Sequence, residues 1–236
     1  FFFGIIMAVS QYFEFVSKTV YEESVSHLTE VFHQSDNMLG ELTHKNLMYL
    51  HMWSEYLQDA PSESKIRDYI DKAQKDAGFL YFYFLSADGN YKMTTGETGY
   101  LGLQENIEDE IQKGNDIITN AAVPGKSQML VFASPKAHGS YQGFKYDAIA
   151  IAYENADIVN VLDISAFNGK AKSYVLHPDG RVVIDHSLES WGNVYNFFGI
   201  LREHTDISEK EILEISKKFK EGHTGAMLLN LDEKDY

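Results

Sequence analysis

The chain contains two closely related stretches, Phe84–Tyr91 (FLSADGNY) and Val175–Val182 (VLHPDGRV). In each, apolar residues run into an Asp-Gly pair and continue into a second β-rich segment, which is the strongest short-range signal for a β-hairpin. Glycine supplies the positive φ angle that such a turn needs, and aspartate caps its own backbone there. The second stretch follows the first by the length of a small domain. The repeat therefore predicts one architecture used twice.

Length and composition narrow the class of protein. With 236 residues the chain can form two modules of about 100 residues that each bury a core. Its net charge of −15, from 20 basic and 35 acidic residues, repels phosphate groups. We therefore expect no nucleic-acid partner and no docking on anionic lipid. The absence of cysteine excludes disulfides, thiolate metal sites and cysteine nucleophiles.

The chain opens with an apolar run at residues 1–9 (FFFGIIMAV). As a helix this run spans about 14 Å, half of a hydrocarbon core of about 30 Å. It lacks the basic flank and the cleavage site of a signal peptide. We interpret residues 1–9 as the outer part of a transmembrane helix, in preference to a buried helix end.

Residues 10–58 are expected to form one long helix, because they contain a single glycine and no proline. Their apolar residues recur at alternating steps of three and four, the period of a helix that packs on a partner. This pattern predicts a homodimer formed through the helix. Pro61 ends the helix, and Ser62 is positioned to cap a second helix at residues 63–76. The periodic residues are Tyr21, Val25, Leu28, Phe32, Leu39, Leu42, Tyr49, Trp53 and Tyr56.

Two modules are expected to follow, at residues 59–168 and 169–236, the second one cut short. In both, a hairpin precedes a helix, a glycine-bounded loop and a further strand. The first module is expected to have a loop at 96–102, a helix at 104–113, a turn at 140–143, and strands at 79–85, 91–95, 128–133, 146–154 and 158–164. The second is expected to have strands at 173–176, 182–185 and 226–231 and a helix at 207–220.

This order of elements resembles the double Cache sensor, a PAS-like extracytoplasmic domain of bacterial transmembrane receptors. The most specific matches are Val161–Ser165 (VLDIS), similar to the strand that ends the distal module, and residues 173–186, similar to the opening of the proximal one. The resemblance implies an α+β fold in which antiparallel sheets are flanked by helices. It also implies a small-molecule ligand in the distal module, a location outside the cytoplasm at the cell membrane, and a cytoplasmic histidine kinase or diguanylate cyclase as output.

The amino-acid-binding members of that family suggest which residues to compare. Asp163 stands where the family's amine-binding aspartate stands, and Tyr100 matches its tyrosine. Glu105 occupies the position of the arginine that grips the ligand carboxylate, and Ile107 and Glu108 replace a Trp-Tyr pair. Because a carboxylate repels a carboxylate, an α-amino acid is not the expected ligand.

Five residues are candidates for ligand binding: Asp163, Tyr100, Tyr83, Asp147 and Tyr153. A charge in an otherwise apolar strand needs a partner, which a ligand amine or a structural salt bridge would supply to Asp163. Asp147, at the opening of a strand, is a weaker candidate of the same kind. The tyrosines, together with Tyr81, offer apolar walls with a polar tip, and core packing is the alternative role for each.

No metal, cofactor or catalytic residue is predicted. The chain has nine histidines, but none has the close spacing of a zinc site. It also lacks a phosphate-cradling glycine loop and a nucleophile elbow.

The leading interpretation is a sensor that binds a small molecule and relays the event through the long helix. A ligand-free module for dimerisation or protein interaction is the first alternative. The second is a surface enzyme acting on glycans, with Asp147 and Asp163 as acid and base about 5–10 Å apart.

Overall fold

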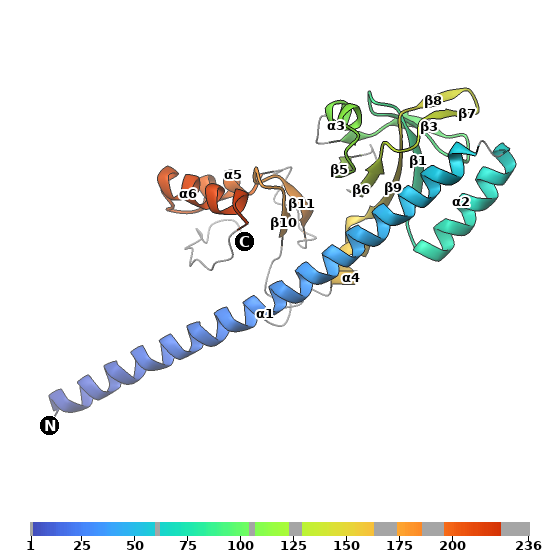
Figure 1. The fold of residues 1–236 in the computed structure, drawn as a ribbon. Helices are drawn as coiled ribbons and strands as arrows, with labels where there is room; N and C mark the ends of the chain where they lie inside the picture. The colour runs from blue at the N-terminus through green and yellow to red at the C-terminus, as the bar shows by residue number, and fades with distance from the viewer. Residues whose placement is uncertain are drawn as a thin grey trace.

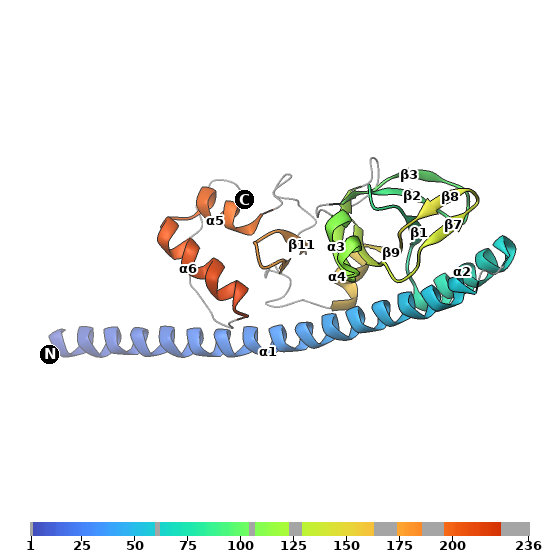
Figure 2. The same ribbon diagram turned by 45° about the horizontal axis from the view of Figure 1, so that its top comes forward.

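A computed structural model describes the structure at residues 2–59, 62–103, 107–122, 129–162, 174–185 and 196–222. A single helix, α1 (Phe2–Gln58), dominates it and confirms the predicted long helix. Both modules lie on the same side of α1, one after the other along its length, and its N-terminal end extends beyond them (Figures 1 and 2). Within the described residues, no helix has the length and apolar character to cross a bilayer. The membrane helix at residues 1–9 stays a prediction.

A second helix, α2 (Glu63–Ala77), lies beside the C-terminal end of α1. Its boundaries agree with the prediction, but the predicted cap does not form. Ser62 occupies the N-cap position, yet its hydroxyl contacts the hydroxyl of Ser64 at 3.2 Å rather than a backbone N–H. The predicted N-cap residue is therefore confirmed, but the predicted hydrogen bond from its side chain is wrong, because a neighbouring side chain competes for the same hydroxyl.

The first module is built on an antiparallel sheet that has seven strands in the described part of the chain. The strand order is β3-β2-β1-β9-β6-β5-β4, which confirms the antiparallel sheet with flanking helices. The strands are β1 (Tyr81–Leu85), β2 (Asn90–Lys92), β3 (Thr98–Tyr100), β4 (Gly102–Leu103), β5 (Ile117–Ala122), β6 (Met129–Ser134) and β9 (Ala148–Glu154). A separate hairpin consists of β7 (Gly139–Tyr141) and β8 (Phe144–Tyr146).

Three expectations for this module were wrong. The predicted loop at 96–102 contains β3 and the start of β4, and β5 was not predicted. Residues 158–162, predicted as part of a strand, belong to the helix α4 (Asn155–Leu162). A short apolar run does not by itself distinguish a buried strand from a helix. In the helix, Ile158 is buried in the core on the α1 side of the sheet. The predicted helix at 104–113 is observed as α3 (Ile107–Lys113).

The two faces of the sheet differ in side-chain size. On the α1 side, alternate residues of the central strands are large, and they pack on Leu50, Trp53 and Leu57 of α1. On the opposite side, β9 carries alanines, β1 carries Tyr81, Tyr83 and Leu85, and β6 carries Met129, Val131 and Ala133. The large residues of the α1 side are Phe82, Phe84, Phe132, Ile149 and Ile151.

The second module begins with the predicted hairpin. The described elements are β10 (Tyr174–Leu176), β11 (Val182–Asp185), α5 (Phe197–His204) and α6 (Glu209–Lys220). Helix α6 was predicted and starts with a capping box, in which Ser208 and Glu211 satisfy each other's backbone N–H groups. Helix α5 was not predicted. The boundary predicted at 168/169 and the strand predicted at 226–231 lie outside the described residues.

The two Asp-Gly turns repeat at the level of individual hydrogen bonds. In the first, the N–H of Asn90 donates to Asp88 Oδ1 at 3.3 Å, and Gly89 has a φ of 86°. In the second, the N–H of Arg181 donates to Asp179 Oδ1 at 3.0 Å, and Gly180 has a φ of 87°. The repeat read from the sequence is therefore confirmed for the turns.

The Gly180→Ala variant is expected to lose more stability than Gly143→Ala. Both glycines have positive φ angles, which cost alanine about 1 kcal/mol. A Cβ at residue 180 would also lie 2.3 Å from Phe198 Cδ2, whereas residue 143 has open space. Overpacking should add about 1–3 kcal/mol for Gly180→Ala alone, measured by urea unfolding. Equal losses in the two variants would contradict this packing.

Candidate functional site

The sheet face opposite α1 is the candidate site. Tyr83 of β1 is in register with Ala150 of β9, which is in register with Ala133 of β6. These three side chains are buried. Leu85 of β1 and Met129 and Val131 of β6 belong to the same apolar cluster, so the side chains on this side of the sheet are small chiefly along β9. We call this surface the tyrosine–alanine face; it consists of Tyr81, Tyr83, Leu85, Tyr91, Met129, Val131, Ala133, Ala148, Ala150 and Ala152.

Three aromatic rings lie together on this face. The ring of Tyr83 stands edge-on to that of Tyr91, with 4.7 Å between centroids, and the Tyr81 ring lies 5.9 Å from Tyr83. Gly99 allows this arrangement, because a Cβ there would lie 2.7 Å from the Tyr91 hydroxyl. The Tyr91 hydroxyl also reaches Glu97 Oε1 at 3.4 Å. The rings therefore form a group with a carboxylate at its edge.

The hydroxyl of Tyr83 is poorly satisfied for a fully buried group. It donates to the thioether sulfur of Met129 at 3.9 Å, and a thioether is a weak acceptor. Burial raises the pKa of Tyr83 well above its usual value of 10, and Tyr91, Tyr81 and Glu97 raise it further. The phenol is thus a neutral donor in surroundings that disfavour additional negative charge.

Helix α3 packs over the tyrosine–alanine face. Ile107 and Ile111 of α3, together with Leu101, belong to the same apolar cluster as Tyr83 and the alanines. The helix ends at Gly114, whose φ of 75° turns the chain towards β5. A molecule bound on this face would therefore lie between the sheet and α3.

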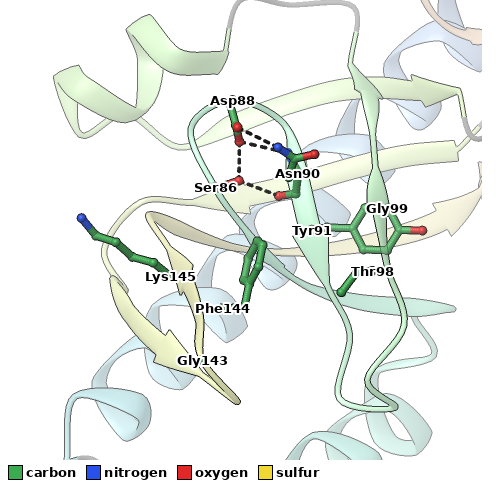
Figure 3. A pocket seen from close by; sticks show the side chains of 9 residues that line it. All are labelled: Ser86, Asp88, Asn90, Tyr91, Thr98, Gly99, Gly143, Phe144 and Lys145. Carbon is green, nitrogen blue, oxygen red and sulfur yellow. Dashed lines mark hydrogen bonds between the residues drawn. The ribbon is translucent and has the colours of Figure 1, made fainter.

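A hollow lies at the surface, between the first hairpin and the β7–β8 hairpin. It is an open depression of about 520 Å³. Figure 3 shows that Ser86 and Asn90 both donate to Asp88 at its rim, while Thr98 and Lys145 also line it. The hydrogen bond from Ser86 lowers the pKa of Asp88, as expected for a carboxylate that caps a turn. The hydrogen bonds among Ser86, Asp88 and Asn90 therefore stabilise the turn.

No family model matches the chain, and no curated protein matches it in sequence. Solved structures are similar to it in fold. The extracellular domain of the putative histidine kinase mmHK1S-Z3 has a TM-score of 0.53 at 10% identity, over 86% of this chain and 83% of that one. The ligand-binding domain of the Pseudomonas aeruginosa PAO1 chemoreceptor PctB, in complex with L-Gln, has a TM-score of 0.52 at 14% identity, over 75% and 74%.

The chain shares the Cache-type fold of these two domains. Within this fold, the tyrosine–alanine face is the side of the first sheet that does not pack on α1. Helix α3 packs on this side instead.

The Cache-type sheet separates the tyrosines predicted to line a site. Tyr83 and Tyr81 lie on the tyrosine–alanine face. Tyr153 lies on the α1 side, where its hydroxyl donates to Asn46 Oδ1 at 2.8 Å. Tyr100 is 60% exposed on β3, and its ring lies against Gly89. The predicted tyrosines therefore do not meet in one place.

Of the two predicted carboxylates, Asp147 lies apart from this face. Asp147 accepts a hydrogen bond from the N–H of Ala87 at 2.9 Å, and its own N–H donates to the carbonyl of Leu85. It thus extends the β1–β9 ladder into the first hairpin. Asp163 and Glu105 lie outside the described residues. Among the residues that are described, no three histidine or acidic side chains converge as a metal ion would require.

Tyr91 and the alanines were not among the residues predicted for the site. The signal was present in β9, whose sequence AIAIAYE alternates small and large residues before Tyr153. Such alternation indicates that side chains of different size pack on the two sides of the strand.

The two buried tyrosines should respond differently to loss of the hydroxyl. Tyr153→Phe leaves Asn46 Oδ1 buried without its donor and should cost about 1–3 kcal/mol of unfolding free energy. Tyr83→Phe removes only the weak bond to Met129 and should cost less than about 0.5 kcal/mol. Urea unfolding of both variants checks this, and a larger loss for Tyr83→Phe would contradict the assignment.

Proposed function

We propose that the chain is the extracytoplasmic sensory domain of a transmembrane receptor, and that its first module binds a small molecule on the tyrosine–alanine face. The fold supports a sensory role for this chain, rather than a catalytic one. The single observation that carries the choice of site is the buried Tyr83 hydroxyl, whose hydrogen-bond partner among the described residues is the thioether of Met129. A ligand oxygen or nitrogen would be a stronger acceptor.

The ligand is a small uncharged or cationic molecule. Burial, the neighbouring tyrosines and Glu97 all disfavour a negative charge beside the Tyr83 hydroxyl, as its raised pKa indicates. The Tyr81, Tyr83 and Tyr91 rings lie within 6 Å of their neighbours and can attract a cation through their faces. Glu97 adds negative charge at the edge of the group. Glu105, where amino-acid-binding relatives carry an arginine, is consistent with this preference.

The signal leaves through α1. In this proposal residues 1–9 continue into the membrane, α1 pairs with its copy in a homodimer, and the output is a cytoplasmic histidine kinase or diguanylate cyclase. Exposed apolar residues on the N-terminal half of α1 support the pairing: Val20, Tyr21, Leu28 and Phe32 are 44–55% exposed. A ligand acts only if it binds the two arrangements of the helix pair with different affinity.

The same exposed residues favour one alternative, a ligand-free module that only dimerises. It shares the helix pairing with the sensor but requires no binding on the tyrosine–alanine face. Ligand binding therefore separates the two functions.

Three probes of nearly equal shape test the site: tetramethylammonium, tert-butanol and pivalate. Tetramethylammonium, at ten or more times its dissociation constant, should raise the Tm by about 3–6 °C. Pivalate should not, since an anion finds no partner, and tert-butanol should have an intermediate effect. Differential scanning fluorimetry at constant ionic strength measures the shifts.

Tyr83→Leu should abolish the shift, because it removes the central ring, while Tyr100→Leu on the exposed strand β3 serves as the matched control and should keep it. A shift lost in Tyr100→Leu alone would place the ligand elsewhere. No shift with any probe, in a chain that dimerises, would favour the ligand-free module.

A further inference from the structure

Strand β5 touches both the proposed binding face and the two parts of the protein that could carry a signal away. Side chains alternate along a strand, so successive residues of β5 face opposite sides of the sheet. Ile117 and Ala121 belong to the cluster of the tyrosine–alanine face. Thr119 faces the same side of the sheet, because it lies two residues from each of them. Ile118 packs against the cluster on the α1 side.

At the start of β5, Asp116 is bonded to α1. Its Oδ2 lies 2.8 Å from Nε2 of His51, and Nδ1 of the same imidazole lies 3.1 Å from Nζ of Lys136. This geometry fits a neutral imidazole that donates to Asp116 and accepts from Lys136. Asp116 lies in the short segment between α3 and β5. Through its bond to His51, it therefore connects α3, which packs over the tyrosine–alanine face, to α1.

Near the other end of β5, Asn120 is bonded to the second module. Its Nδ2 donates to the carbonyl of Val182 in β11 at 2.9 Å, and the side chain is 3% exposed. Ile184 of β11 is part of the large cluster between the first sheet and α1. The second module is therefore joined to the first at β5.

Each of these bonds leaves one buried oxygen unused. Asp116 Oδ1 and Asn120 Oδ1 have no hydrogen-bond partner among the described residues. An unpaired buried oxygen costs free energy, and a small shift of β5 that gave either oxygen a donor would recover it. A shift of β5 would therefore change its contacts at both Asp116 and Asn120.

We propose that β5 is the mechanical link between the tyrosine–alanine face and both outputs, α1 and the second module. This inference rests on the proposed function for its purpose, because it names the route by which occupancy of that face is relayed. Asp116 directly precedes β5 and lies about 13 Å from Asn120 along the extended chain, and residues 117–121 of β5 are paired with β6. A displacement of the strand therefore moves both contacts.

Hydrogen exchange read by mass spectrometry tests the link in the full chain without ligand. Asp116→Ala should speed exchange about 3–10-fold in β10 and β11, residues 174–185, which Asp116 does not touch. Asp147→Ala is the matched control, since it removes a carboxylate bonded to the hairpin of β1 and is not on β5. In the reverse direction, Asn120→Ala should speed exchange in residues 46–58 of α1.

If Asp116→Ala changes exchange only around α1, or Asp147→Ala changes 174–185 equally, the link is refuted. Should Asp116→Ala fail to fold, His51→Ala breaks the same bond from the helix side and gives the same expected result. Because no ligand is present, coupled exchange in a chain that binds none of the three probes would overturn the proposed function alone. Probe binding without coupled exchange would overturn this inference alone.

Discussion

Trp53 of α1 packs against Phe79 and Phe82, with ring centroids 5.4 and 5.9 Å away, and stacks on Tyr49 of its own helix. Together with Leu50 it fixes the helix across one face of the first sheet. This packing requires large side chains on alternate positions of the central strands. It leaves the other positions, on the opposite face, free to be small.

The asymmetry has an energetic consequence for binding. The alanines of β9 bury less apolar area than the isoleucines on the other side of the same strand. In the proposed function, a molecule bound on the tyrosine–alanine face stabilises the folded state by mass action. In that proposal, β5 joins the binding face to α1 and to the second module.

Sequence analysis could predict the features that rest on local signals. The Asp-Gly turns at Gly89 and Gly180 and the unbroken helix α1 need no tertiary information. Strand β5 (IITNAA) begins with β-forming residues but ends in Asn-Ala-Ala, and the run around Ile158 fits either a strand or a helix, so tertiary packing determines both structures. The residues of the candidate site could not be predicted, because they depend on which side of the sheet each strand residue faces. Tyr83 and Tyr153 look alike in sequence, and only the position of α1 reveals that they face opposite sides.

The most direct measurement follows the tyrosine ring signals by NMR in a chain with ¹³C-labelled tyrosine while tetramethylammonium is added. If the ligand binds the face that α1 leaves uncovered, the signals of Tyr81, Tyr83 and Tyr91 shift in a saturable manner. The signals of Tyr141, Tyr146 and Tyr153, buried on the α1 side, then stay in place. Saturable shifts in this second group, or none in the first, would contradict the account.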